Sequence, residues 1–295
     1  MAKKFTGVTT ALVTPFSDDM SVDFEAMKKL IDFQIDQGVD NILVCGSTGE
    51  SATLSSKEKQ AVIIQAVEHT DKRVPVIVGS GSNNTQESVD MTLVAKEYGA
   101  DAVLLVAPYY NKPTQEGLYN HYYNIAESVD IPQIIYNVPG RSGVNIHPEI
   151  QLKLAEDCEN IIATKEASGD LEQIMQIIKN KPEDFIVLSG DDALTLPIIL
   201  LGGEGIVSVL SNYAPKAFSK CVHYALDGKY DKAVELHYEL MELMALNFIE
   251  TNPVPVKTAL AMTGKLKEKV RLPLMPMLPA NRELLEDELK KHKLI

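Results

Sequence analysis

The sequence contains no tryptophan, only three cysteines and no apolar run long enough to cross a membrane. Its longest apolar stretches, such as residues 102–107 and 196–201, fall well short of the roughly 20 residues that a spanning helix needs. Threonines and a proline interrupt the first 15 residues, so we predict no signal peptide and a cytoplasmic protein. Cys45, Cys158 and Cys221 lie far apart and are odd in number, which predicts buried, reduced thiols.

Positive charge is also scarce. The 28 lysines and arginines face 41 acidic residues, a formal net charge of −13, which disfavours a nucleic-acid partner. The six histidines show no metal-binding spacing, no Walker-type loop is present, and Gly79-Ser80-Gly81 is too short for a dinucleotide fingerprint. We therefore expect neither a metal nor an organic cofactor.

Short apolar segments alternate with amphipathic ones along the first 214 residues. Strands without polar alternation are buried on both faces, which is typical of a parallel sheet covered by helices. Eight such units in a row favour a closed (β/α)8 TIM barrel over an open sheet. The expected strands are residues 8–14, 41–44, 74–78, 102–106, 133–136, 161–164, 185–188 and 206–209.

Helices are expected between these strands, beginning at caps that the sequence supplies. Ser55 with Glu58, and Asn84 with Glu87, have the spacing of a capping box. After residue 214 the chain is predicted to be helical to its end. We therefore predict a barrel domain over residues 1–225 and a helical extension, packed on the barrel, over residues 226–295.

Polar groups follow the expected strands at one end of this barrel. The carboxyl ends of barrel strands surround a single cavity, so residues far apart in sequence meet there. The segments concerned are residues 46–50, 108–111, 136–141, 165–168 and 189–192. The glycine-rich residues 202–205 precede the eighth strand and belong to the opposite end, which disfavours a phosphorylated substrate.

Lys165 ends the apolar run 161–164, so its side chain is expected inside the barrel mouth. A lysine there is partly removed from water, which makes the neutral, nucleophilic amine more available. The alternative is a strand-end lysine that pairs with a carboxylate such as Glu166. Tyr136 ends the neighbouring strand and is suited to proton transfer during imine formation, unless it is a core tyrosine with a satisfied hydroxyl. Together they favour a class I, Schiff-base-forming aldolase acting on a 2-keto acid.

Two further segments suit carboxylates. In the 46–50 turn, glycines let the backbone approach a ligand, and the hydroxyls of Ser47 and Thr48 are placed to hold a small carboxylate. The alternative is an ordinary strand-to-helix loop. Arg141 lies in a Pro-Gly-Arg-Ser-Gly loop and is suited to clamp a second carboxylate in bidentate fashion; the alternative is a surface salt bridge.

These segments, in this order, resemble the family of pyruvate-dependent class I aldolases and lyases that contains dihydrodipicolinate synthase and N-acetylneuraminate lyase. The resemblance runs from about residue 5 to the final helices. It implies the condensation of pyruvate, held as an imine, with L-aspartate 4-semialdehyde on the diaminopimelate route to lysine. It also implies a homotetramer built as a dimer of dimers, with no metal or organic cofactor.

The resemblance assigns roles residue by residue. The implied catalytic residues are Lys165, Tyr136, Ser47 and Tyr110, the last reaching across a dimer interface into the partner's site. The implied substrate-binding residues are Thr48, Arg141, Val207 and Gly190, with Arg141 taking the carboxylate of the semialdehyde. The positions that match a regulatory site for free L-lysine are Ser51, Ala52, Ser56, Lys59, Asn83, Glu87 and Tyr109.

Some alternatives remain open within this resemblance. Ser47 replaces the threonine usual in the synthases, a form familiar from neuraminate lyases, whereas Arg141 favours the synthase. A lyase or aldolase for a sugar acid is therefore the alternative activity. A non-catalytic barrel that senses a keto acid is a further alternative, which the presence of Lys165 and Tyr136 disfavours. For lysine binding, Lys59 adds a cation that could repel the ligand, and the alternative role of Glu87 is the helix cap.

Overall fold

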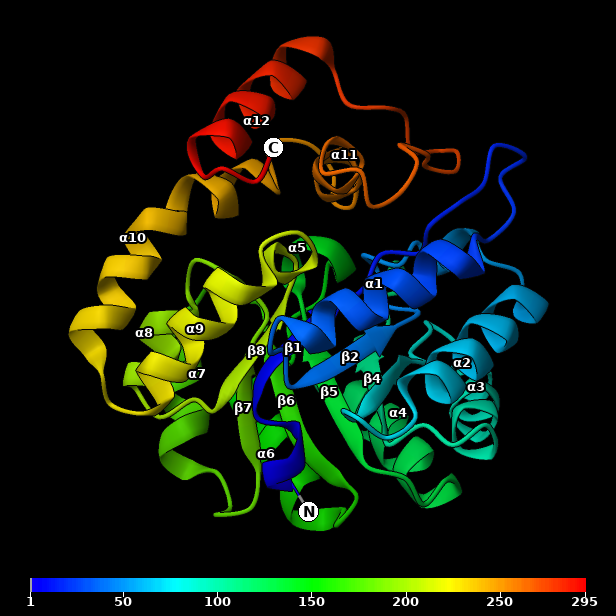
Figure 1. The fold of residues 1–295 in the computed structure, drawn as a ribbon. Helices are drawn as coiled ribbons and strands as arrows, with labels where there is room; N and C mark the ends of the chain where they lie inside the picture. Colours follow the sequence, from blue (N-terminus) through cyan, green and yellow to red (C-terminus); the bar gives the residue numbers. More distant parts are fainter. Residues whose placement is uncertain (1) are drawn as a thin grey trace.

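The computed structural model describes residues 2–295 and contains a closed barrel of eight parallel strands in sequential order (Figure 1), which confirms the predicted fold class. Each strand pairs with the next, and β8 pairs with β1 to close the barrel. The strands are β1 (Gly7–Ala11), β2 (Asn41–Val44), β3 (Val76–Gly79), β4 (Ala102–Val106), β5 (Gln133–Asn137), β6 (Ile161–Glu166), β7 (Ile186–Ser189) and β8 (Gly205–Ser208).

Helices cover the outside of this barrel. They are α1 (Phe24–Asp36), α2 (Ser56–Thr70), α3 (Thr85–Glu97), α4 (Gln115–Ser128), α6 (Pro148–Asp157), α7 (Leu171–Asn180), α8 (Thr195–Leu200) and α9 (Pro215–Leu226). A short helix, α5 (Pro139–Ser142), follows β5 at the mouth. Short 3-10 turns occur at Ala2–Phe5, Ser51–Thr53 and Leu210–Asn212. The extension contains α10 (Tyr230–Leu246), α11 (Val254–Met262) and α12 (Pro279–Lys291).

The strands bury both of their faces, as their lack of polar alternation predicts. Side chains such as Leu43, Ile77 and Leu188 fill the barrel interior. Their strand neighbours, such as Val44 and Val187, pack outward into the layer beneath the helices. Successive side chains of a strand point alternately into these two layers. A residue at the carboxyl end of a strand therefore reaches the mouth only if its position points into the barrel.

The first predicted strand is too long at its carboxyl end. Pairing of β1 ends at Ala11, although the apolar run continues. The backbone N–H of Val13 donates to the side chain of Asn212 instead of to a neighbouring strand. A side-chain acceptor from a distant turn therefore ends the ladder, and no local pattern in the sequence announces it.

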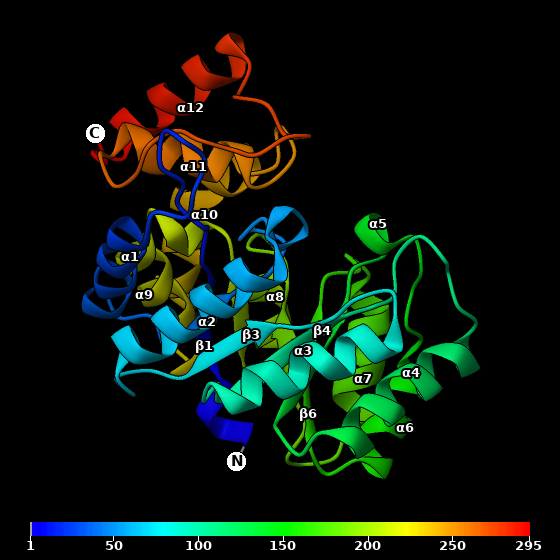
Figure 2. The same cartoon turned by 90° about the vertical axis from the view of Figure 1, so that its right-hand side faces the viewer.

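The extension is not helical throughout, so that prediction is wrong over residues 247–253 and 263–278. Prolines at positions 273, 276 and 279 lack the N–H that a helix interior needs, and Gly264 adopts a left-handed conformation that ends α11. Figure 2 shows that α11 and α5 lie at the same end of the barrel, the end where the strands terminate. The division into domains at residue 225 stays a prediction.

The two predicted capping boxes have different outcomes. Ser55 and Glu58 form the reciprocal box at the start of α2. Asn84 does cap α3, by accepting from the backbone N–H of Gln86 and Glu87. The carboxylate of Glu87, however, accepts from the hydroxyl of Ser82 at 2.7 Å and does not return to the cap. The second box is therefore half formed, and the Glu87 carboxylate is directed to another place.

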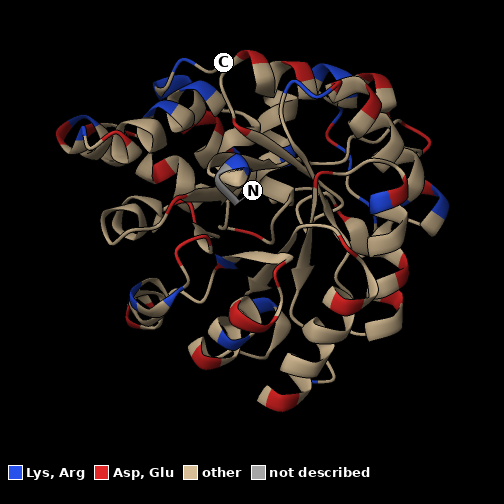
Figure 3. Ribbon diagram, turned by 90° about the horizontal axis from the view of Figure 1, so that it is seen from below, with Lys and Arg blue, Asp and Glu red and all other residues tan. Residues whose placement is uncertain are grey.

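No helix among the described residues is long and apolar enough to span a bilayer. All three cysteines are buried and free, as predicted. Seen from the side of the N-terminus, acidic and basic residues are interspersed along the outer helices (Figure 3). This view shows no extended basic face that would suit a polyanion.

Candidate active site

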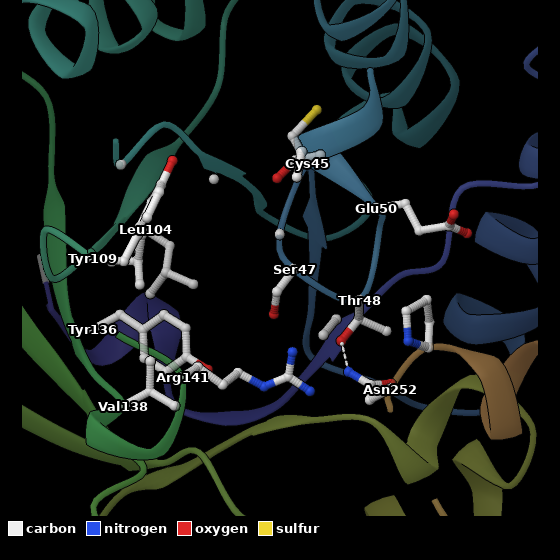
Figure 4. A pocket seen from close by; sticks show the side chains of 18 of the residues that line it. Cys45, Ser47, Thr48, Glu50, Leu104, Tyr109, Tyr136, Val138, Arg141 and Asn252 are labelled. Carbon is white, nitrogen blue, oxygen red and sulfur yellow. Dashed lines mark hydrogen bonds between the residues drawn. The ribbon is translucent and has the colours of Figure 1, made fainter. Parts of the chain in front are cut away.

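A cavity of about 440 Å³ opens at the carboxyl ends of the strands. Its walls come from the turn after β2, from β4 and β5, from α5, and from the segments before and after α11 (Figure 4). The residues predicted at the carboxyl ends of different strands therefore meet in this cavity. They include Ser47, Thr48, Tyr109, Tyr136, Arg141 and Lys165.

Lys165 and Tyr136 form the centre of this cavity. They are register partners on β6 and β5, so their side chains leave adjacent strands at the same height. The Lys165 Nζ lies 3.9 Å from the centroid of the Tyr136 ring, and Lys165 is 6% exposed. Neither the amine nor the phenol has a hydrogen-bond partner among the described residues. Both groups are therefore free to engage a ligand.

Glu166 does not pair with Lys165, so that alternative is wrong. Its buried carboxylate faces away from the cavity and accepts from amide groups of Asn137, Gln151 and Gln173. The Ser168 hydroxyl donates to the other carboxylate oxygen at 2.7 Å. Burial raises the pKa of Glu166, although these donors act in the opposite direction. This network joins β5, β6, α6 and α7 directly behind the two central side chains.

The consequence of that network is geometric. Asn137 follows Tyr136, and Glu166 follows Lys165. Asn137 and Glu166 are also register partners, and the Nδ2 of Asn137 donates to the Oε1 of Glu166 at 2.9 Å. A bond on the outer face of the wall therefore fixes how Tyr136 and Lys165 lie on the inner face.

The 46–50 turn lies across the cavity from these strands (Figure 4). Cys45 and Glu50 adopt left-handed conformations at either end, which turns the backbone sharply. The Ser47 hydroxyl is exposed and has no partner among the described residues. The Thr48 hydroxyl accepts from the side-chain amide of Asn252 at 2.9 Å. Because the Thr48 hydroxyl accepts this hydrogen bond, its own proton remains available to donate to a ligand.

Arg141 projects from α5 toward this turn (Figure 4). Its guanidinium has no carboxylate within ion-pair distance among the described side chains, so the surface salt bridge is not formed. An arginine without an internal partner at the rim of a cavity is suited to bind a ligand carboxylate.

Two predicted substrate-binding residues lie deeper than the cavity wall. Gly190 follows β7, and a Cβ placed on it would lie 2.9 Å from the Cε of Lys165. Val207 on β8 packs with Tyr136 inside the barrel. Tyr110, by contrast, is 90% exposed and does not line the cavity of its own chain.

The predicted regulatory positions are only partly brought together. Those that line the same cavity are Ser51, Ala52, Lys59, Glu87 and Tyr109. Asn83 lies beside them, because its amide donates to the carbonyl of Tyr109 at 3.2 Å. Ser56 begins α2, is exposed and does not line the cavity.

The extension supplies wall residues that sequence reasoning missed. Asn252, Pro253, Pro273 and Leu274 line the cavity, and Lys257 lies immediately behind it. More than 200 residues separate Asn252 from Thr48, so no spacing rule signals their contact. The break in helical pattern around residues 271–279 was the available sign of a special segment.

The arrangement suits covalent capture of a carbonyl compound. An unpaired amine, a phenol and two hydroxyls surround one space, and an arginine stands at its rim. Burial raises the pKa of the Cys45 thiol to about 12, which makes this lining residue a poor nucleophile. Among the described residues, no group of three His, Cys, Asp or Glu side chains is arranged to hold a metal ion.

Comparisons with known proteins agree over nearly the whole chain. The sequence model of the dihydrodipicolinate synthetase family matches residues 4–292. The chain is similar to the 4-hydroxy-tetrahydrodipicolinate synthase of Hydrogenobaculum sp. (strain Y04AAS1), with 50% identity over 290 residues, covering 98% of this chain and 99% of that protein.

Two solved structures with ligands are also similar. One is the chloride-inhibited dihydrodipicolinate synthase from Acinetobacter baumannii complexed with pyruvate (TM-score 0.96, 42% identity, 98% of this chain and 99% of that chain). The other is DHDPS from Cyanidioschyzon merolae with lysine bound (TM-score 0.96, 39% identity, 99% of each chain).

Proposed function

This chain belongs to the dihydrodipicolinate synthetase family, and from that premise we propose that it is a 4-hydroxy-tetrahydrodipicolinate synthase. The proposed reaction condenses pyruvate with L-aspartate 4-semialdehyde, on the diaminopimelate route to lysine and in the cytoplasm. The observation that carries the proposal is the unpaired amine of Lys165 beside the Tyr136 ring, in a cavity that also presents Arg141.

In the first half-reaction, the neutral amine of Lys165 attacks the keto carbon of pyruvate and water leaves, giving an imine. The Tyr136 hydroxyl is placed to donate a proton to the departing oxygen and to take one back. Ser47 and Thr48, across the cavity, are placed to hold the pyruvate carboxylate, so that the keto carbon is presented to Lys165. No metal or organic cofactor is required for these steps.

In the second half-reaction, loss of a methyl proton converts the imine into an enamine, whose carbon attacks the aldehyde of the semialdehyde. The carboxylate of this second substrate would bind the Arg141 guanidinium. Its amine then attacks the imine carbon and displaces Lys165, which closes the ring and frees the enzyme. Gly190 contributes by leaving room for the Lys165 side chain, and Val207 packs with Tyr136.

The experiment that tests the capture step is borohydride reduction in the presence of pyruvate. We expect one reduced adduct, on Lys165, when peptides are analysed by mass spectrometry. Labelling of a different lysine, or of none, would refute the mechanism. Two assays then distinguish the synthase from the lyase: one with the semialdehyde, coupled to a reductase, and one with N-acetylneuraminate. They are needed because the turn that contains Ser47 does not by itself separate the two activities.

Tyr110 supports the proposal of a shared site between subunits. This bulky residue adopts φ +73°, a strained conformation for a non-glycine residue, and presents its ring to solvent. A partner subunit that received the ring would remove apolar surface from water and place the Tyr110 hydroxyl in the relay with Tyr136 and Ser47. Exposed apolar residues on another face, Leu200, Leu201, Val234, Tyr238 and Met241, are consistent with a second interface and a homotetramer.

A regulatory role for L-lysine is the last part of the proposal. The Glu87 carboxylate accepts one hydrogen bond, from Ser82, through one of its two oxygens, and Glu87 lines the cavity together with Lys59 and Tyr109. The Glu87 carboxylate would bind the ammonium of the ligand, and Lys59 would be placed to meet its carboxylate.

Titration of L-lysine into the coupled assay tests this role. We expect inhibition in the wild type and its loss in Glu87→Ala. Glu97→Ala, at the last residue of α3, serves as the matched control. Full activity of the wild type at millimolar lysine would refute the regulatory site and leave the catalytic proposal intact.

A further inference from the structure

A buried ion pair lies behind the turn that carries Ser47 and Thr48. Lys257 on α11 is fully buried, and its Nζ lies 2.5 Å from the Oε1 of Glu50, the last residue of that turn. The same Nζ donates to the carbonyl of Lys269 at 2.8 Å. The other oxygen of Glu50 accepts from the backbone N–H of Arg271 at 3.0 Å. Three segments of the chain therefore meet at one carboxylate.

The pair is enclosed on its other sides. The Lys257 Nζ lies 4.0 Å from the centroid of the Phe16 ring, and the guanidinium carbon of Arg271 lies 4.4 Å from the same centroid. The Arg271 guanidinium is itself held by Glu58 at the start of α2 and by the carbonyl of Met20. Hydrogen bonds therefore hold both carboxylate oxygens of Glu50 in one arrangement.

Glu50 is directly linked to the residues proposed to hold the keto acid. Its backbone N–H donates to the carbonyl of Ser47 at 3.1 Å, so the two residues form one tight turn. Glu50 also adopts the left-handed conformation that closes this turn. A movement of Glu50 is therefore transmitted to Thr48 and Ser47, which precede it by only two and three residues.

We propose that the Lys257–Glu50 pair positions the 46–50 turn, so that Ser47 and Thr48 present their hydroxyls to the carboxylate of the keto acid. The proposal rests on the proposed function of that turn. Lys257 and Glu50 act as positioning residues: Glu50 lines the cavity, but the proposal does not require either side chain to touch the substrate. The pair thereby makes the C-terminal extension part of the substrate site.

A stability role alone is a poor explanation for such a pair. Removing two charges from water costs so much that a buried ion pair is often no more stabilising than apolar residues of the same volume. What it does supply is a defined geometry, because only one arrangement satisfies both charges. Burial lowers the pKa of Lys257 to about 8, yet Glu50 and the Lys269 carbonyl occupy its amine, which lies outside the cavity lining.

The test is a double-mutant cycle with Lys257→Met, Glu50→Gln and the variant that carries both. For each protein, the urea midpoint of unfolding and the KM and kcat for pyruvate are measured. Either single substitution leaves one group buried without its partner, so both should lower the unfolding midpoint. Both should also raise the KM for pyruvate about tenfold or more, because the displaced turn holds the carboxylate less well.

The double substitution separates positioning from stability. It removes both charges, so the unfolding midpoint should return toward that of the wild type. If the pair positions the turn, the KM for pyruvate stays raised. A KM that recovers together with the midpoint would overturn the proposal and leave the pair as a stabilising contact only. If the single variants do not fold, Glu50→Asp, which keeps the charge on a shorter side chain, replaces them with the same expected rise in KM.

Lys181 and Glu204 provide a matched control. Lys181 donates to Glu204 at 2.8 Å and to the carbonyl of Phe185, and Glu204 accepts from the backbone N–H of Val187. The hydrogen-bond pattern is the same, but this pair is more exposed and lies at the opposite end of the barrel. Lys181→Met should lower the unfolding midpoint without changing the KM for pyruvate; an equal rise in KM would overturn the proposal. The proposed function would be refuted by a wild type that forms no pyruvate imine. That result is independent of the variants, so it is distinct from a failure of the positioning proposal.

Discussion

Gly190→Ala is the smallest substitution that presses directly on the proposed nucleophile. A Cβ at this position would lie 2.9 Å from the Cε of Lys165, 2.7 Å from the Cβ of Ala167 and 3.2 Å from the carbonyl oxygen of Glu166. The backbone cannot withdraw easily, because the Gly190 N–H donates to that same carbonyl at 2.7 Å. The flexible Lys165 side chain can therefore move away, whereas the Cβ of Ala167 can move only together with its backbone.

The size of the effect follows from these distances. Ordinary contact between carbon atoms begins at about 3.5 Å, so the Lys165 Cε has to shift by roughly half an ångström or more. Overpacking of this kind costs about 1–3 kcal/mol of stability. A misplacement approaching 1 Å at a reacting group costs up to about 100-fold in rate. We therefore expect Gly190→Ala to slow imine formation about 10- to 100-fold, with a modest loss of stability.

Single-turnover trapping of the pyruvate imine with borohydride measures this rate, and urea unfolding measures the stability. Gly140→Ala is the control within the same mouth, because a Cβ there would meet nothing within 4 Å. We expect it to trap pyruvate within about twofold of the wild-type rate. If folded Gly190→Ala traps pyruvate as fast as the wild type, the close approach to Lys165 does not matter for the chemistry and the reasoning fails.

Arg141→Ala should weaken use of the semialdehyde by about 2–3 kcal/mol of transition-state binding, but hardly affect imine formation with pyruvate; equal losses in both steps would mean that Arg141 only supports its loop. The hydrogen bond between His223 and Asp40 raises the pKa of His223 above 6.5. The stabilisation from this contact is therefore complete below pH 6.5 and is lost as the pH rises through the raised pKa. The difference in unfolding free energy between wild type and His223→Gln should therefore shrink from pH 5.5 to pH 9, and a difference that grew would contradict this sign. Mixing inactive Tyr110→Phe with inactive Lys165→Ala under subunit exchange should restore activity if Tyr110 completes the partner's site, and no recovery despite proven exchange would count against sharing.

The sequence predicts the barrel well because the signal is carried by whole strands. A run such as Ala102–Val106 is apolar at every position, which is typical of a strand buried on both faces. The boundaries are less predictable. The end of β1 depends on Asn212, nearly 200 residues away, which takes the N–H of Val13. A prediction that uses local pattern has no access to such a partner.

The site is likewise predictable in one part and not in another. Lys165, Tyr136 and the 46–50 turn follow from one rule, because the carboxyl ends of barrel strands share a mouth. The wall that the extension contributes follows from no such rule. Pro273 and Leu274 reach the cavity only because residues 263–278 leave the helix and cross the mouth, where Arg271 ties them to Glu58. That contact also holds the pKa of Glu58 at about 2.

Two buried lysines show which physical property identifies a nucleophile. Lys257 is the more deeply buried, and its lowered pKa is the perturbation usually taken to mark a functional group. Its amine, however, is occupied by Glu50 and a backbone carbonyl, and it does not line the cavity. Lys165 lines the cavity and has no ionic partner among the described residues. Since a nucleophile must be both reachable and unpaired, access and the lack of a partner select Lys165, whereas burial alone would have selected Lys257.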